Sequence, residues 1–319
     1  MATKGKNVDV EEIQITLDDY TKDAVTLLAD TIKGQEIGTT TDIQRLNCKL
    51  AKSLPAISDK MLNSDTPTQM SLKLGVGDNI ELDTVITLDW SLNTTLMDAQ
   101  YTQLDRMVYD TIISFCAKGM RAFTVAMIYR SMAGHSGDTT VSEASRKAIT
   151  ASINKLTSYK VALDYTAQVH KRHSDITQFV IKDRLLNVVE AEVTICGQVT
   201  TGYMLLNTPS LYRYAMTLNQ LVSYSSKDLL PPGNATLQRS VIANYLRQHI
   251  AILQRNKNVS HKLTYDKMYE AFEADTPKDK ITVREYIATC LNYWVGQGLI
   301  KHWDNIMQRR QYYAIIIDV

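Results

Sequence analysis

The sequence of 319 residues lacks the features that membrane, secreted and disulfide-bonded proteins need. It has no apolar run long enough to span a bilayer, and its start, MATKGKNVDVEE, lacks the apolar centre of a signal peptide. Its four cysteines are scattered without CxxC spacing, which favours reduced core residues over a disulfide framework or a zinc site. These absences predict a cytoplasmic protein without a membrane partner.

Sequence motifs of common enzymes are also missing. The chain has no GxxxxGK(S/T) phosphate loop, no HExxH zinc motif and no GxSxG nucleophile motif. We therefore expect no enzymatic activity and no cofactor, although a nuclease can distribute its carboxylates without a motif. His170 and His173 stand three residues apart, but no further ligand cluster accompanies them, so a metal site is the less favoured interpretation.

The net charge of +1 conceals a split along the chain. Residues 1–100 contain nine basic and 16 acidic side chains, which gives a net charge of −7. Residues 101–237 and residues 238–319 each have a net charge of +4. The last two thirds of the chain therefore tolerate an anionic partner better than its start does.

The periodicity of apolar residues divides the chain into parts. Residues 1–68 have helical periodicity and are predicted to form an acidic extension. The next segment alternates apolar and polar residues, which predicts a hairpin with its turn at Gly75–Asn79. Two prolines and a glycine within Leu229–Asn234 predict a linker. The predicted domains are the N-terminal helical extension at 1–68, a first domain with added strands at 69–230 and a second domain at 231–319.

The first and second domains contain the same order of patterns. Thr124 and Thr264, which are 140 residues apart, each precede a short helical pattern. Thr140 and Thr282 each begin a Thr-x-x-Glu capping box, which is followed by a longer helix with an apolar stripe. A strand, a basic loop and another strand come next. This is the order of a winged helix-turn-helix, so the predicted fold is α+β and helix-rich, with two such domains in tandem.

The longer helix of each domain exposes side chains that can contact base edges. Asn, Arg and Lys can form paired hydrogen bonds with bases, and Thr can contact a thymine methyl group. A helix fits the major groove of B-DNA. The candidate DNA-binding residues are Arg146, Lys147, Thr150 and Asn154 in the first helix, and Arg284, Thr289, Asn292 and Tyr293 in the second. An ordinary solvated helix face is the alternative for each of them.

Two basic loops are predicted to form the wings. VHKRHSD contains Lys171 and Arg172, IMQRRQ contains Arg309 and Arg310, and Lys301 lies in the strand before the second loop. Basic side chains in such loops contact phosphates or enter the minor groove, and they add salt-dependent affinity rather than sequence information. A hairpin tip whose charges only keep the protein soluble is the alternative.

Two segments, TPSLYRYAMTLNQL…LLPPGNATLQRSVIANYLRQHI and KDKITVREYIATCLNYWVGQGLIKHW, resemble initiator-like proteins from phages and plasmids of Gram-positive bacteria. The tandem plan over residues 80–319 resembles the iteron-binding plasmid replication initiators. That resemblance implies that the second winged helix contacts the bases of the repeat, through Arg284, Thr289, Asn292 and Tyr293. It also implies that the first winged helix contacts flanking backbone or forms a dimer interface. The acidic extension has no counterpart in that family.

These observations predict a nucleoid-associated protein of a mobile element that binds double-stranded DNA with sequence specificity, at direct or inverted repeats, alone or as a homodimer. Replication initiation and repression of its own promoter, a form of transcription regulation, would use the same surface, so both stay open. A winged-helix module that docks proteins without DNA would also fit these patterns, and so would a protein that organises or segregates DNA by spreading along it.

Overall fold

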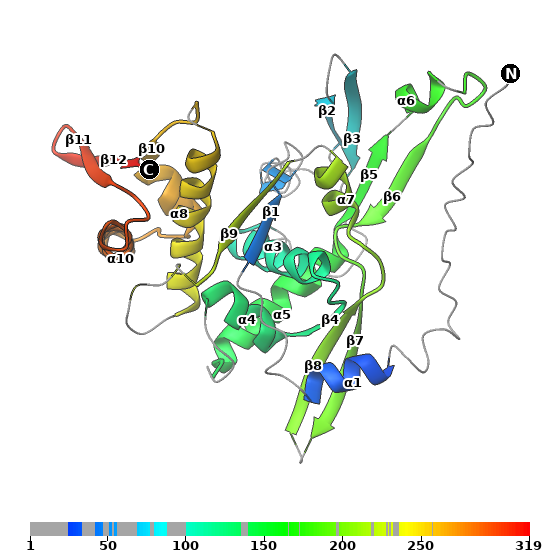
Figure 1. Ribbon diagram of the computed structural model, residues 1–319, viewed down its shortest axis with the longest axis horizontal. Coiled ribbons are helices and arrows are strands. Elements are labelled where there is room, and N and C mark those ends of the chain that lie inside the picture. Colours follow the sequence, from blue (N-terminus) through cyan, green and yellow to red (C-terminus); the bar gives the residue numbers. More distant parts are fainter. Residues whose placement is uncertain are drawn as a thin grey trace, which may run out of the picture.

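The computed structural model describes residues 25–33, 42–46, 51–52, 54–55, 69–76, 80–87, 100–134, 140–164, 166–171, 173–195, 198–217, 220–227, 229, 231, 236–256 and 258–319. In this part of the chain the fold is α+β, with helices and five small antiparallel sheets (Figure 1).

Within the described residues, helices and strands are interspersed along the sequence. The helices are α1 Val25–Lys33, α3 Gln103–Ala117, α4 Val125–Ala133, α5 Glu143–Ser158, α6 Thr166–His170, α7 Ser210–Thr217, α8 Leu237–Arg255, α9 Tyr265–Ala271 and α10 Pro277–Gly296. The strands are β1 Asp42–Leu46, β2 Gln69–Val76, β3 Ile80–Thr87, β4 Ala122–Thr124, β5 Lys160–Asp164, β6 Val180–Arg184, β7 Val188–Ile195, β8 Gln198–Leu205, β9 Leu221–Ser225, β10 Lys262–Thr264, β11 His302–Gln308 and β12 Gln311–Asp318.

Two segments repeat one order of elements, namely a helix, a three-residue strand, two helices and a hairpin. The first unit, residues 103–205, contains α3, β4, α4, α5 and the β7–β8 hairpin, with β5, α6 and β6 inserted before the hairpin. The second unit, residues 237–318, contains α8, β10, α9, α10 and the β11–β12 hairpin. The strand orders β4-β8-β7 and β10-β12-β11 match, because in each sheet the short strand pairs with the last strand of the hairpin.

The longer helices begin at other residues than predicted. Helix α5 begins at Glu143, because the Ser142 hydroxyl accepts the Ser145 amide at 3.2 Å, and Thr140 lies outside the helix. Helix α10 begins after the cap Thr276. Thr282 therefore lies inside α10, so both predicted capping boxes are wrong.

The earlier start of α10 has a local cause. Proline in the first turn already has the helical φ and needs no donor there. The Thr276 hydroxyl also accepts the Asp279 amide at 3.2 Å, which satisfies one of the orphan donors of the helix. The shorter helices follow the expectation more closely. Thr124 caps α4 by accepting the Met127 amide, and Thr264 occupies the cap position of α9 without a side-chain hydrogen bond.

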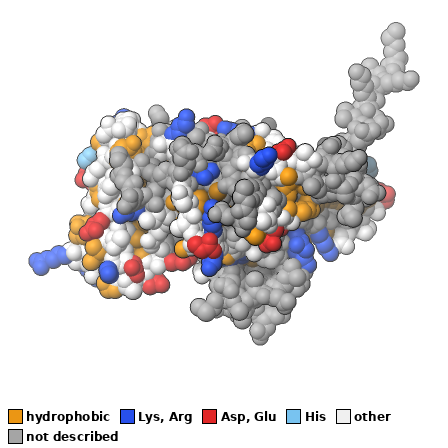
Figure 2. Space-filling model, turned by 90° about the horizontal axis from the view of Figure 1, so that it is seen from below, with side chains coloured by type: hydrophobic (Ala, Val, Ile, Leu, Met, Phe, Trp, Pro, Cys, Tyr) orange, Lys and Arg blue, Asp and Glu red, His pale blue; other side chains and the backbone are white. Residues whose placement is uncertain are grey.

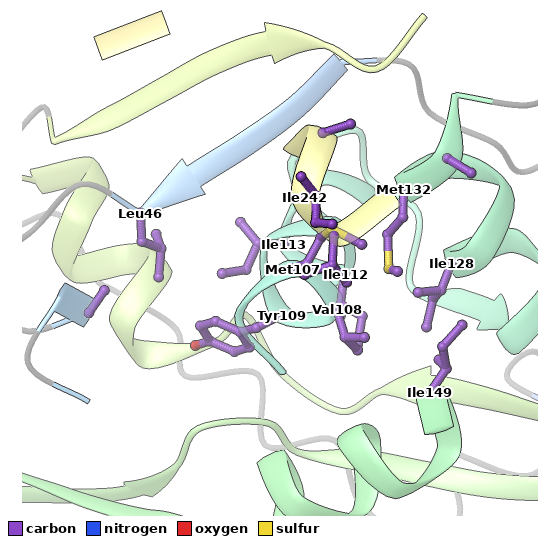
Figure 3. Close-up of a cluster of buried hydrophobic side chains, with 14 of the residues drawn as sticks. Leu46, Met107, Val108, Tyr109, Ile112, Ile113, Ile128, Met132, Ile149 and Ile242 are labelled. Carbon is purple, nitrogen blue, oxygen red and sulfur yellow. The ribbon is translucent and has the colours of Figure 1, made fainter. Parts of the chain in front are cut away.

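Side chains of α3 form the centre of the core. Met107, Val108, Ile112 and Ile113 are fully buried and face side chains from β1, α4, α5 and α8 (Figure 3). Ile242 of α8 joins the same cluster, which continues into α9, α10 and β12. Helix α8 packs against α3, α4 and α10, so it belongs to the cores of both units.

The described parts of residues 1–68 pack against the first unit. Helical periodicity was the wrong prediction for residues 42–46, which form the strand β1. Helix α1 packs on β4 and β8, and β1 pairs in antiparallel fashion with β9 (Figure 1). Polar side chains of α3 hold β1 in place. Ser114 accepts the Gln44 amide at 2.7 Å and Asp110 accepts the Leu46 amide at 3.3 Å, while Arg106 donates to the Leu46 carbonyl at 3.1 Å.

Candidate nucleic-acid interface

Helix α10 turns one face to the core and the opposite face to solvent. Its buried residues are Val283, Ile287, Cys290, Leu291 and Trp294. The exposed residues of the opposite face are Lys278, Ile281, Thr282, Glu285, Thr289 and Asn292. This outward face is therefore open to a partner.

The β11–β12 hairpin ends in two arginines. The strands pair as far as Gln308 and Gln311, which leaves Arg309 and Arg310 as a two-residue turn. Both arginines are exposed, and their φ angles of 51° and 64° are left-handed. Turns of this kind match the twist of a hairpin but usually contain Asn-Gly, because side chains with a β-carbon are strained there. The hairpin lies at the left end of the molecule in Figure 1, and Figure 2 shows basic side chains projecting at that end.

Two of the predicted base-contacting residues are held against the hairpin. Arg284 donates from Nη1 to the Tyr269 hydroxyl at 2.8 Å, and its guanidinium lies 4.8 Å from the centre of the Tyr312 ring. Asn292 is exposed, but its Oδ1 accepts the indole Nε1–H of Trp303 at 2.9 Å. These contacts tie α10 to the hairpin, so Arg284 and Asn292 position the hairpin relative to the helix.

The other predicted residues of the second unit also make contacts within the chain. The Thr289 hydroxyl donates to the backbone carbonyl of Glu285 at 2.8 Å, so its methyl group remains for an outside partner. Tyr293 is half-buried and packs on the core. Lys301 is exposed, and its Nζ donates to the Val319 carbonyl at 3.0 Å.

A buried tyrosine supports the hairpin from below. Burial is the main reason why the pKa of Tyr265 lies well above its usual value, so its hydroxyl stays protonated. That hydroxyl donates to Asn305 Oδ1 of β11 at 2.7 Å, and the ring stacks on Tyr269 with centroids 5.7 Å apart. Helix α9 thereby contributes to the placement of the hairpin.

Helix α5 of the first unit presents a less polar face. Lys147 and Asn154 are exposed, and Arg146 is half-exposed. The Lys147 Nζ lies 3.8 Å from Oε1 of Glu143, one turn earlier in the helix. Thr150 is half-buried, so only part of its side chain can reach an outside partner.

The first basic loop lies away from the repeated sheet. Lys171 follows α6, in the connection between β5 and β6, and these strands pair with each other rather than with β4. Arg172 lies outside the described residues. The hairpin that corresponds in topology to β11–β12 is β7–β8, and its exposed charges on β7 are Glu190 and Glu192. The described part of this hairpin is therefore acidic.

Of the seven predicted residues of the second unit, four lie on the outward side of α10 or at the tip of the hairpin that α10 contacts. Thr289 and Asn292 lie on the outward side of α10, and Arg309 and Arg310 lie at the tip of the adjoining hairpin. Sequence reasoning missed the exposed Glu285 on that face. The apolar stripe of the helix already indicated that Glu285 lies opposite the core. Glu285 was instead interpreted as part of the predicted capping box, which would give it a structural role.

Metal sites and membrane spans are absent from the residues that the structure describes. No group of three or more His, Cys, Asp or Glu side chains there could hold a metal ion. Among the helices of the described ranges, none is long and apolar enough to cross a membrane.

Comparison with known proteins identifies no family for this chain. No family model and no curated protein matches it. A crystal structure of RctB domains 2-3 is similar with a TM-score of 0.38 and 12% identity, over 80% of this chain and 92% of that one. A structure of selenomethionine derivatives of RctB domains 2 and 3 is similar with a TM-score of 0.36 and 13% identity, over 80% of this chain and 93% of that one.

Proposed function

We propose that the chain is a sequence-specific double-stranded DNA-binding protein made of two winged helix-turn-helix units, and that it acts by binding rather than by catalysis. The observation that carries the proposal is the open face of α10 beside a hairpin that ends in Arg309 and Arg310. A helix can enter the major groove, while a basic hairpin tip contacts phosphates of the same duplex.

Replication initiation and autoregulatory repression are the roles we propose for this binding, at repeated sites of a mobile element. The support is the tandem order of elements together with the sequence resemblance to initiator-like proteins. The two roles would share one surface. They separate in a cell-based assay in which the gene and its upstream region either maintain a plasmid or silence a reporter.

A gel shift with the DNA upstream of the gene tests the proposal. The full chain should bind this duplex more tightly than a scrambled duplex, and affinity should fall as salt rises, because phosphate contacts release counterions. Arg309→Glu/Arg310→Glu should lower the slope of log affinity against log salt by about 2. Lys182→Glu/Lys227→Glu makes the same charge change at exposed positions away from the hairpin, and it should leave the slope unchanged. Equal binding to scrambled DNA would contradict the proposal.

Docking of a protein is a second candidate function, for the first unit alone. Its β7–β8 hairpin exposes Glu190, Glu192 and the apolar Val199, which is 63% exposed. Acidic side chains repel phosphates, whereas an apolar surface with a charged rim suits a protein partner, in the simplest case a second copy. Glu190→Lys/Glu192→Lys should then alter the sedimentation coefficient of the free protein without raising its affinity for DNA.

A further inference from the structure

The outward face of α10 has a carboxylate at its centre. Glu285 is exposed and stands opposite the buried stripe of the helix, with Thr282 on one side along the axis and Thr289 on the other. If α10 enters the major groove, Glu285 is the side chain that points most directly at the bases. The inference therefore rests on the proposed function.

No partner within the described chain neutralises this carboxylate. None of the described cations lies within ion-pair distance of Glu285, and those nearest to it along the helix have other contacts. Arg284 turns to Tyr269 and Tyr312, and the Lys280 ammonium lies 5.4 Å from the centre of the Tyr269 ring. The middle of the face consequently keeps its negative charge.

The two flanking threonines leave Glu285 as the strongest hydrogen-bonding group there. The Thr282 hydroxyl donates to the Lys278 carbonyl at 3.1 Å and the Thr289 hydroxyl donates to the Glu285 carbonyl at 2.8 Å. Because their protons are used inside the helix, both threonines present methyl groups to an outside partner. Methyl groups contact thymine methyls or fill space, so polar base recognition at this level falls to the carboxylate.

A carboxylate accepts hydrogen bonds and donates none, which limits the bases it can select. Phosphates repel it, and so do the major-groove acceptors of guanine and the O4 of thymine. Cytosine presents its N4 amino group as a donor, and adenine presents N6 beside the acceptor N7. We propose that Glu285 is a specificity-determining residue that selects cytosine at the base pair facing the centre of α10.

Selection from a random duplex library tests this assignment. The full chain, Glu285→Gln, Glu285→Ala and the control Glu270→Gln, an exposed acid on α9, are each incubated with duplexes that carry a randomised segment of about 20 base pairs, two turns of DNA. The wild type and the control should enrich cytosine at one position. Glu285→Gln should change that position to adenine, because a glutamine can pair with both N6 and N7. Glu285→Ala should lose the preference there alone, with about tenfold weaker discrimination.

The outcomes separate the assignment from the function on which it rests. If Glu285→Ala and Glu285→Gln enrich the same base as the wild type at every position, the assignment to Glu285 is overturned and sequence-specific binding stands. If the wild type itself enriches no sequence, the proposed function fails together with the assignment. A change of preference at one position in Glu285→Gln, with no change in Glu270→Gln, supports both.

Discussion

Replacing the Arg309–Arg310 turn by Asn-Gly should stabilise the fold and weaken the proposed DNA binding at the same time. Both arginines have left-handed φ angles, of 51° and 64°. That conformation costs a residue with a β-carbon about 1 kcal/mol, whereas Asn-Gly adopts it readily in hairpins. Relief at both positions should raise the free energy of unfolding of Arg309→Asn/Arg310→Gly by about 1–2 kcal/mol. The melting temperature, measured by calorimetry, should then rise by about 2–4 °C.

The same variant removes two positive charges from the hairpin tip. If each arginine contacts one phosphate, the slope of log affinity against log salt should become shallower by about 2. Titration of a labelled duplex at several salt concentrations measures this slope. Stability and affinity should thus change in opposite directions, which a merely damaged protein would not show.

Lysine substitutions provide the matched control. Arg309→Lys/Arg310→Lys keeps both charges and both β-carbons, so its melting temperature and salt slope should stay close to those of the wild type. An Asn-Gly variant with an unchanged slope would refute phosphate contact at the tip. An Asn-Gly variant without added stability would refute the argument from backbone strain.

Three further predictions concern stability. Gly134→Ala should cost about 3 kcal/mol or more in urea unfolding, because φ is +68° and an added Cβ would lie 2.0 Å from a backbone carbonyl oxygen; a cost below about 1 kcal/mol would contradict this close approach. Trp303→Phe and Asn292→Ala should each cost about 1 kcal/mol, and the double variant should cost less than the sum, because both lose one hydrogen bond; full additivity would contradict the coupling. Burial lowers the pKa of His249 to about 4, so the native state binds fewer protons than the unfolded chain up to pH 6.5 and gains stability as pH rises. Burial raises the pKa of Asp110 to about 6, which has the opposite effect. Between pH 4 and 6, the free energy of unfolding of His249→Gln should therefore fall by about 3 kcal/mol relative to that of the wild type. Over the same range, the free energy of unfolding of Asp110→Asn should rise by about 3 kcal/mol relative to that of the wild type. Stability profiles that run parallel to the wild-type profile would contradict both pKa shifts.

Local patterns in the sequence predicted much of the fold. Alternating residues gave the β2–β3 hairpin, although β2 continues to Val76, two residues into the predicted turn, before β3 begins at Ile80. The repeat at a spacing of 140 residues gave two short helices that each follow a three-residue strand. Each of these signals depends on neighbours in the chain.

Features that depend on distant contacts could not be predicted in the same way. The strand before the first basic loop was expected to begin a wing, and β5 does pair with β6 across that loop. This hairpin is not part of the sheet β4-β8-β7, however, and sequence order alone does not reveal which sheet a hairpin joins. Arg284 and Asn292 lie on the expected helix, yet Tyr312 and Trp303 determine where their polar atoms point. A helical wheel gives the face of a residue but not the contacts of its functional group.

The arrangement of α8 has a practical consequence for dissecting this protein. The helix is 19 residues long and its buried residues contact both halves of the molecule. Either half expressed alone would therefore expose an apolar surface to solvent. The composition suggests dividing the chain at the prolines within Leu229–Asn234. That division would separate α8 from the helices α3 and α4 on which it packs. Fragments divided there should precipitate or associate, and co-expression of the two pieces should restore a soluble complex.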